Sequence, residues 1–90
     1  MPIITTWNAE DFVKVFNATK PYPAAEPIVC VHGLSVEGED YVVAESPRDG
    51  GILLRYLEKV KSENVADDIQ RVLEYFADNL DAVVVEGMVE

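Results

Sequence analysis

The spacing of apolar residues near the start of the chain predicts a short amphipathic helix. Asn8 is a suitable N-cap, Asp11 follows three residues later, and the helix is expected to cover residues 8–18. Three prolines within residues 21–27 then predict a stiff, extended connector, because proline fixes φ and has no N–H to donate.

The middle of the chain predicts a β-hairpin. β-branched side chains dominate residues 28–36, an acidic turn follows at residues 37–40, and apolar residues resume over 41–45 as the returning strand. A second helix is expected to begin at Ser46, with proline at its first position, and to continue to Val60. Its expected apolar face consists of Ile52, Leu53, Tyr56, Leu57 and Val60.

A third helix and a last strand complete the expected elements. Ser62 or Asn64 can cap a helix that ends near Asn79, since apolar residues recur there every three to four positions. Residues 82–85 form a β-branched run that can pair with the hairpin. The pattern therefore predicts a single α+β domain over residues 1–90. A small antiparallel sheet (the hairpin plus a possible C-terminal strand) would carry two to three helices.

Composition narrows the class of protein. The one cysteine, Cys30, cannot form an internal disulfide, so the chain requires no oxidising compartment. No apolar run approaches the roughly 20 residues that span a bilayer, and the first residues do not resemble a signal peptide. We therefore expect a cytoplasmic protein (in the host cytoplasm if a phage encodes it) that makes no membrane contact.

The charge is large and unevenly placed. Seventeen acidic residues against seven basic ones give a net charge of −10. Residues 37–49 carry −4 and residues 63–90 carry −7, while the remaining residues together carry +1. Phosphates repel such a chain, so direct nucleic-acid binding is disfavoured and a basic protein partner, itself a nucleic-acid-binding protein, is favoured. Ordinary solubility and a halophilic source are the alternative explanations.

Acidic side chains of the third helix fall on one side of it. At 100° per residue, four of them lie within about 60° of one another, opposite the apolar stripe. They are Asp67, Glu74, Asp78 and Asp81, which we call the acidic row. Spacings of about 5–10 Å resemble a line of phosphates, although any solvated helix face must also be polar. The hairpin turn adds three further acids: Glu37, Glu39 and Asp40.

Candidate catalytic groups are few. Cys30 and His32 should share one strand face, where they could form a nucleophile pair or half a metal site; a face partly buried in the core is the simpler expectation. Neighbouring acids diverge on a helix or strand, which argues against two-carboxylate chemistry. We expect no enzyme activity, metal or cofactor. We also expect Trp7 and Tyr22 to pack in the core or in a lid over it rather than to form exposed anchors.

One stretch of the chain resembles a known family. Residues 38–46 read Gly-Glu-Asp-Tyr-Val-Val-Ala-Glu-Ser and precede an expected amphipathic helix and then an acid-rich helix. In this run, and in architecture over about residues 38–80, the chain resembles small acidic phage anti-CRISPR proteins that inhibit Cas nucleases. The resemblance implies an α+β domain that occupies the DNA-binding surface of a nuclease and presents carboxylates to its lysines and arginines.

Two functional hypotheses follow. The first is a small protein inhibitor that binds a basic nucleic-acid-binding protein, with a CRISPR-Cas effector as one candidate, and occludes its site by charge mimicry. Its contact residues would be the acidic row and the three hairpin acids. The alternative is a subunit or adaptor that forms a homodimer, or binds a partner, through an exposed strand such as residues 82–85.

Overall fold

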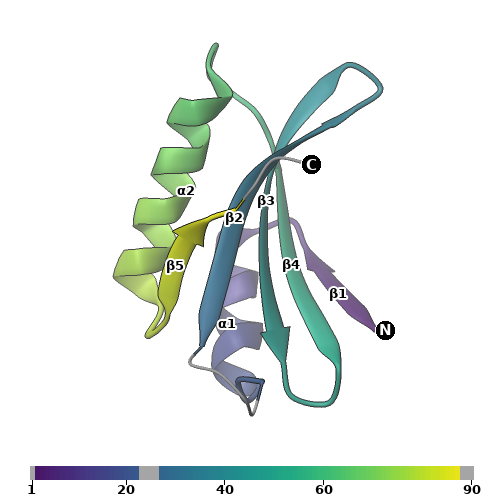
Figure 1. Ribbon diagram of the computed structural model, residues 1–90, viewed down its shortest axis with the longest axis vertical. Helices are drawn as coiled ribbons and strands as arrows, with labels where there is room; N and C mark the ends of the chain where they lie inside the picture. Colours follow the sequence, from purple (N-terminus) through teal and green to yellow (C-terminus); the bar gives the residue numbers. More distant parts are fainter. Residues whose placement is uncertain (1, 23–26, 88–90) are drawn as a thin grey trace.

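The computed structural model describes residues 2–22 and 27–87 of the chain (Figure 1). These residues form five strands and two helices. Their bounds are β1 Ile3–Thr6, α1 Ala9–Ala18, β2 Ile28–Val36, β3 Glu39–Arg48, β4 Ile52–Lys59, α2 Val65–Asn79 and β5 Val83–Glu86. The α+β class expected from the sequence is confirmed, with two helices.

All five strands belong to one mixed sheet with the order β1-β4-β3-β2-β5. β3 pairs antiparallel with β2 and β4, whereas the two outer pairings, β1 with β4 and β2 with β5, are parallel. The expected hairpin is present, and the C-terminal strand pairs with it. The sheet is larger than the small antiparallel one predicted, because β4 and β1 extend it beyond β3.

Both helices pack on the same face of the sheet. β1 leads through α1 to β2, and β4 leads through α2 to β5, and both connections step across the sheet in the same direction. Parallel crossovers share one handedness, so two crossovers in the same direction place their helices on the same side. A single buried cluster joins side chains of both helices to the sheet, in agreement with this topology. Among the described residues, no helix covers the other face.

The core lies between the helices and the sheet, and aromatic rings hold its centre. The ring of Phe76 from α2 lies 4.7 Å from that of Phe12 from α1, and 5.7 Å from that of Tyr56 on β4, which it meets edge-on. The central strands contribute small branched or short side chains beneath these rings: Val29, Val31, Val42, Ala44 and Leu54. These contacts fix both helices on the sheet.

Asparagine caps start both helices, as the sequence predicts. The Asn8 side chain accepts a hydrogen bond from the Glu10 N–H at 2.8 Å, and the Asn64 side chain accepts one from the Ala66 N–H at 3.0 Å. Each bond satisfies a backbone donor that has no partner within the helix. The predicted helices at residues 8–18 and 64–79 are therefore confirmed.

The helix expected from Ser46 to Val60 is wrong. Gly50 and Gly51 have φ angles of 82° and 77°, in the left-handed region that favours glycine, so this segment forms a tight turn between β3 and β4. After the turn, alternate side chains of β4 face the helices, which is the period of a strand rather than of a helix. The apparent helical face resulted from apolar side chains on both sides of this strand.

The residues taken for a helix N-cap instead end β3. Ser46 is buried, and its hydroxyl donates to the Ile28 carbonyl at 2.7 Å, where it extends the contact between β3 and β2. Pro47 follows the last residue pair of the β2–β3 ladder, Cys30 with Glu45, so its missing N–H costs no bond to β2.

Arg48, the last residue of β3, ties the sheet to the end of α1. Its side chain is buried, and its guanidinium donates to the carbonyls of Phe16 and Thr19 at 2.9 and 2.8 Å and to the Thr19 hydroxyl at 2.9 Å. The same group stacks over the Phe16 ring, 3.9 Å from its centroid. Burial lowers the pKa of Arg48 from its usual value, although such a group stays charged at any physiological pH.

Candidate binding surfaces

The acidic row occupies the solvent side of α2. Asp67, Glu74 and Asp78 are all exposed, and buried residues of the same helix, such as Val72 and Phe76, face the sheet. Figure 1 shows α2 along one side of the sheet, with its far side free of other elements. The structure therefore places three members of the row on one outward helix face, as the sequence predicts.

The fourth member, Asp81, lies beyond the helix. α2 ends at Asn79, and its C-cap residue Leu80 has extended backbone angles, so Asp81 does not follow the helical periodicity. It is exposed and lines a hollow of about 290 Å³ with Pro27 and Val83. The helical projection used for Asp81 was wrong, although the residue stays at the same end of the molecule as the end of α2.

The basic residue nearest to the row is paired elsewhere. Arg71 is hydrogen-bonded to Glu58 of β4 and lies 3.9 Å from the Asp68 carboxylate. Glu58 also faces Lys61, with 3.6 Å between the charged atoms. Within the described part of the chain, no salt bridge joins a member of the acidic row to a cation. The row is thus a run of uncompensated negative charge.

Asp68, next to the row in sequence, has a structural role. Its carboxylate is buried and accepts hydrogen bonds from the backbone N–H groups of Lys61 and Ser62, at 2.7 and 3.3 Å. The first of these bonds is the main cause of a lowered pKa for Asp68, and it outweighs the burial that would raise the pKa. Asp68 therefore fixes the connection between β4 and α2 and is not available to a partner.

The three hairpin acids do not share one surface. All are exposed at the β2–β3 turn, which extends beyond the rest of the sheet in Figure 1, and Glu37 occupies the turn itself with a φ of 51°. Glu39 pairs with Lys59 at 3.2 Å, on the sheet face away from the helices, and this bond lowers its pKa. Asp40 comes next in the strand and points to the opposite face. The predicted contact set is therefore divided between the two faces of the sheet.

The sheet face opposite the helices forms a second candidate surface, which we call the open face. It consists of the outward-pointing strand residues Ile3, Thr5, Ile28, Cys30, His32, Leu34, Val36, Glu39, Tyr41, Val43, Glu45, Pro47, Leu53, Arg55, Leu57, Lys59, Val83 and Val85. Most of these side chains are apolar. This surface is not predicted by the sequence pattern, in which residues 46–60 resemble a helix and β1 gives no signal.

Glu45 is the polar centre of the open face. Its carboxylate accepts hydrogen bonds from His32 Nε2 at 2.9 Å and from the Arg55 guanidinium at 3.0 Å. Burial alone would raise the pKa of Glu45, but the bonds from His32 and Arg55 together outweigh it and lower the pKa. Cys30 and His32 do share a strand face, as predicted, but it is this open face and not the core.

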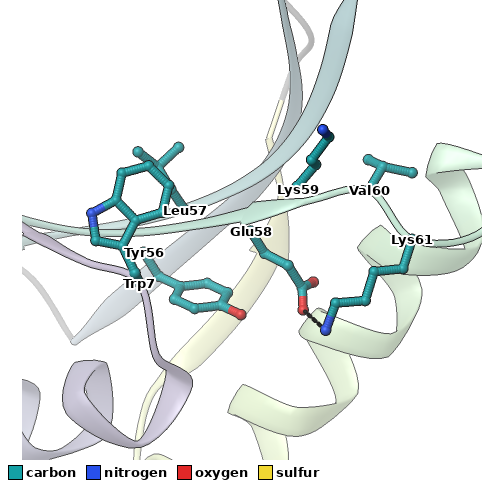
Figure 2. Close-up of a pocket in the computed structure, with 7 residues that line it drawn as sticks. All are labelled: Trp7, Tyr56, Leu57, Glu58, Lys59, Val60 and Lys61. Carbon is teal, nitrogen blue, oxygen red and sulfur yellow. Dashed lines mark ion pairs between the residues drawn. The ribbon is translucent and has the colours of Figure 1, made fainter.

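A hollow of about 400 Å³ lies where β1 ends and β4 continues with β3 as its only neighbouring strand among the described residues (Figure 2). β1 stops opposite Tyr56, and Trp7 lines the hollow together with residues 56–61, which are the end of β4 and the two residues after it. Trp7 and Tyr22 are both exposed, so neither packs in the core as expected. Four titratable side chains line the hollow: Tyr56, Glu58, Lys59 and Lys61. Glu58 is paired with Arg71 and Lys61. Desolvation raises the pKa of Tyr56 to about 12, so its phenol stays protonated near neutral pH.

Residues 2–22 and 27–87 contain no cluster of three or more His, Cys, Asp or Glu side chains suited to a metal ion. Nor does this part of the chain contain a helix long and apolar enough to cross a membrane. No family model, curated protein or solved structure matches the chain. The acidic row and the open face are therefore the features on which the proposed functions rest.

Proposed function

We propose that the chain is a binding protein without catalytic activity, and that it presents the carboxylates of α2 to a basic protein partner whose own ligand is nucleic acid. The observation that carries this proposal is the exposed, uncompensated run of Asp67, Glu74 and Asp78 on the outward face of α2. Along the helix axis these residues are about 6–10 Å apart, a spacing at which successive carboxylates can meet successive basic side chains of a groove.

The position of Asp78 favours a functional reason for the charge. The C-terminal end of a helix carries partial negative charge, and α2 has no basic residue in its last turn. A carboxylate there destabilises the helix, and Glu74, one turn earlier, adds repulsion. Solubility alone would be served equally well by acids placed elsewhere, at no cost to the helix.

Binding would be electrostatic and steric. A basic groove attracts the row over a distance, which speeds association, and the bound domain then excludes nucleic acid from the same groove. Glu37 and Asp40 at the hairpin turn are further candidates for contact, whereas Glu39 already has Lys59 as its partner. A Cas nuclease, which the resemblance over residues 38–46 implies, is one partner to test; the amphipathic helix that this resemblance placed after residue 46 is strand β4 in the structure.

The test is capture of partners from a cell lysate at low and high salt, with the immobilised wild-type chain and two variants. Glu74→Lys with Asp78→Lys reverses two charges of the row. Glu10→Lys with Asp11→Lys makes the same change in net charge at the exposed start of α1. We expect basic proteins to bind the wild type and the α1 variant at low salt, and the row variant to lose them. Equal capture by all three proteins would refute the proposal.

A second candidate function is a subunit or adaptor that binds through the edge of its sheet. β5 is the edge strand beside β2, and Val83 on it is exposed, which favours addition of a further strand there. Assembly of this kind rests on main-chain hydrogen bonds and apolar contacts. It would persist at high salt, where capture through the acidic row would be lost.

A further inference from the structure

Among residues 2–22 and 27–87, the large apolar side chains that remain exposed lie on or around the open face. Ile3, Val36 and Val83 point outward from three different strands of that face and are 48%, 46% and 45% exposed. Trp7 and Tyr22, at 68% and 49%, border it at its two ends. The partly buried apolar residues of the helices, in contrast, pack against the core. These exposed side chains lie at the margins of the open face, on its two edge strands and at both ends, around the central pairs of Glu45 with His32 and Arg55. Apolar side chains exposed on one side of a molecule mark that side as a candidate interface.

Two shallow hollows on this face could each accept a side chain of a partner. One, of about 170 Å³, is lined by Trp7, Leu34, Val36, Tyr41 and Leu57, all apolar or aromatic. Another, of about 130 Å³, lies toward the opposite end of the strands, with Tyr22, Pro47 and Leu53 in its wall. Aromatic residues beside such hollows are the usual anchors of protein interfaces.

The charges of the open face balance within it. The acids Glu39 and Glu45 pair with Lys59 and Arg55, at 3.2 and 3.0 Å, so the face carries no net charge in a chain of −10. A strongly basic partner would therefore find no electrostatic attraction here. In a two-fold symmetric interface the same surface of each copy meets the other. Two copies of the open face would not repel each other, because this face has no net charge and its acids alternate with bases.

From these observations we infer that the open face binds a second copy of the chain, sheet against sheet, to form a symmetric homodimer. With strands about 4.8 Å apart and about 3.3 Å per residue, the five strands present about 550 Å² per copy. Two copies bury about 1,100 Å², which reaches the roughly 1,000 Å² that a stable interface needs. The result is four layers, with helices outside and the two sheets in contact.

This arrangement keeps the acidic rows apart. With layers about 10 Å apart, the two helix layers are separated by about 30 Å, and the rows on their outer sides are farther apart still. The Debye length at physiological ionic strength is about 8 Å, so salt screens their repulsion almost completely. Both rows remain available to partners, and the dimer does not depend on the function proposed for them.

The inference is tested by the mass of the chain in solution and by the fluorescence of Trp7, its single tryptophan. Sedimentation equilibrium should give twice the 10.0 kDa chain mass at high concentration, with no loss of dimer as salt is raised. Dilution should shift the Trp7 emission to longer wavelength, because this side chain borders the interface and becomes more hydrated in the monomer.

Two matched variants identify the surface. Ile3→Lys with Val36→Lys places two charges on the open face, at sites already half exposed to solvent, so the monomer should fold as before; circular dichroism checks this. Ala66→Lys with Ala77→Lys makes the same change on the exposed side of α2. We expect the first variant to be monomeric and the second to remain dimeric.

Two results would overturn the inference. One is a wild-type chain that stays monomeric at every concentration tested. The other is a dimer that persists in the Ile3→Lys, Val36→Lys variant, as expected if two β5 edges paired instead, since neither substitution touches that strand.

Discussion

At the scale of single residues, buried polar groups explain how a small chain holds its helices in place. Arg48 satisfies carbonyl groups at the end of α1, and Asp68 satisfies N–H groups before the start of α2. Both positions are helix ends or loops, where backbone groups lack regular partners. Neither role can be predicted from the sequence, because Arg48 lies 29 residues from Thr19 and an acid beside Asp67 resembles surface charge.

Arg48→Met should destabilise the fold by about 2–4 kcal/mol. The methionine can replace the packing of the stem, but the carbonyls of Phe16 and Thr19 would be left buried without donors. The free energy of unfolding in urea measures the loss. Arg48→Lys keeps the charge without the planar fork and should recover part of the stability. A loss below about 0.5 kcal/mol for methionine would show that α1 is held by its apolar face alone.

Asp68 should make stability depend on pH at the acid end. Its pKa is lowered in the folded chain, so its contribution is complete above the unfolded pKa of about 3.9 and is lost as the pH falls through the folded value. Asp68→Asn should cost about 1–2 kcal/mol at neutral pH, because a charged acceptor binds the Lys61 and Ser62 N–H groups more strongly than an amide does. The difference from wild type should shrink as the pH falls below about 4. Urea titrations at several pH values test this, and a constant difference would contradict it.

At the scale of elements, the sequence predicts the two helices, the hairpin and the C-terminal strand, but it misses β4 and β1. Asparagine caps and apolar spacing identify α1 and α2, and β-branched runs identify β2, the first part of β3, and β5. β4 has apolar residues on both faces, so its alternation is hidden, and the glycines that form its turn resemble a weak helix start. β1 has four residues, too few for a periodic signal, and becomes a strand by pairing with β4.

The two candidate surfaces also differ in how far the sequence predicts them. The acidic row depends on local helical periodicity, so three of its four members could be found from the sequence, and Asp81 was misplaced because α2 ends two residues earlier. The open face depends on which distant strands become neighbours. It could not be predicted once β4 had been assigned as a helix.

Replacing an acid by lysine should change the stability of the fold in opposite directions at the two ends of α2. Asp78→Lys removes a carboxylate from the negative end of the helix dipole and its repulsion with Glu74, and should stabilise the fold by about 0.5–1.5 kcal/mol. Asp67→Lys, in the first turn, should destabilise it by about 0.3–1 kcal/mol. Thermal unfolding of the two variants at low salt measures both effects. Equal shifts of the same sign would show that the helix dipole does not decide the cost of these charges.

At the scale of the whole molecule, the two layers have different surfaces. The helix layer faces solvent with uncompensated carboxylates, whereas the sheet presents apolar side chains and internally paired charges. The topology produces this division, because both crossover helices lie on one face. A protein with one charged layer and one apolar layer is suited to self-association on one side and to a charged partner on the other.

These two interactions should respond to salt with opposite signs. Capture of a basic partner by α2 weakens as salt screens the attraction, while the dimer loses only the weak repulsion between two chains of −10. Salt titration therefore separates the two surfaces without any mutation. Loss of both interactions over the same range of salt would contradict the division between them.

The central claim is that the acidic face of α2 occupies a site that otherwise holds nucleic acid. The most direct measurement is competition: a basic partner captured by the chain is loaded with labelled nucleic acid, and the chain is then titrated in. We expect the wild type and the Glu10→Lys, Asp11→Lys variant to displace the nucleic acid, and the Glu74→Lys, Asp78→Lys variant to fail. A stable ternary complex, with the nucleic acid and the wild-type chain bound together, would contradict the claim.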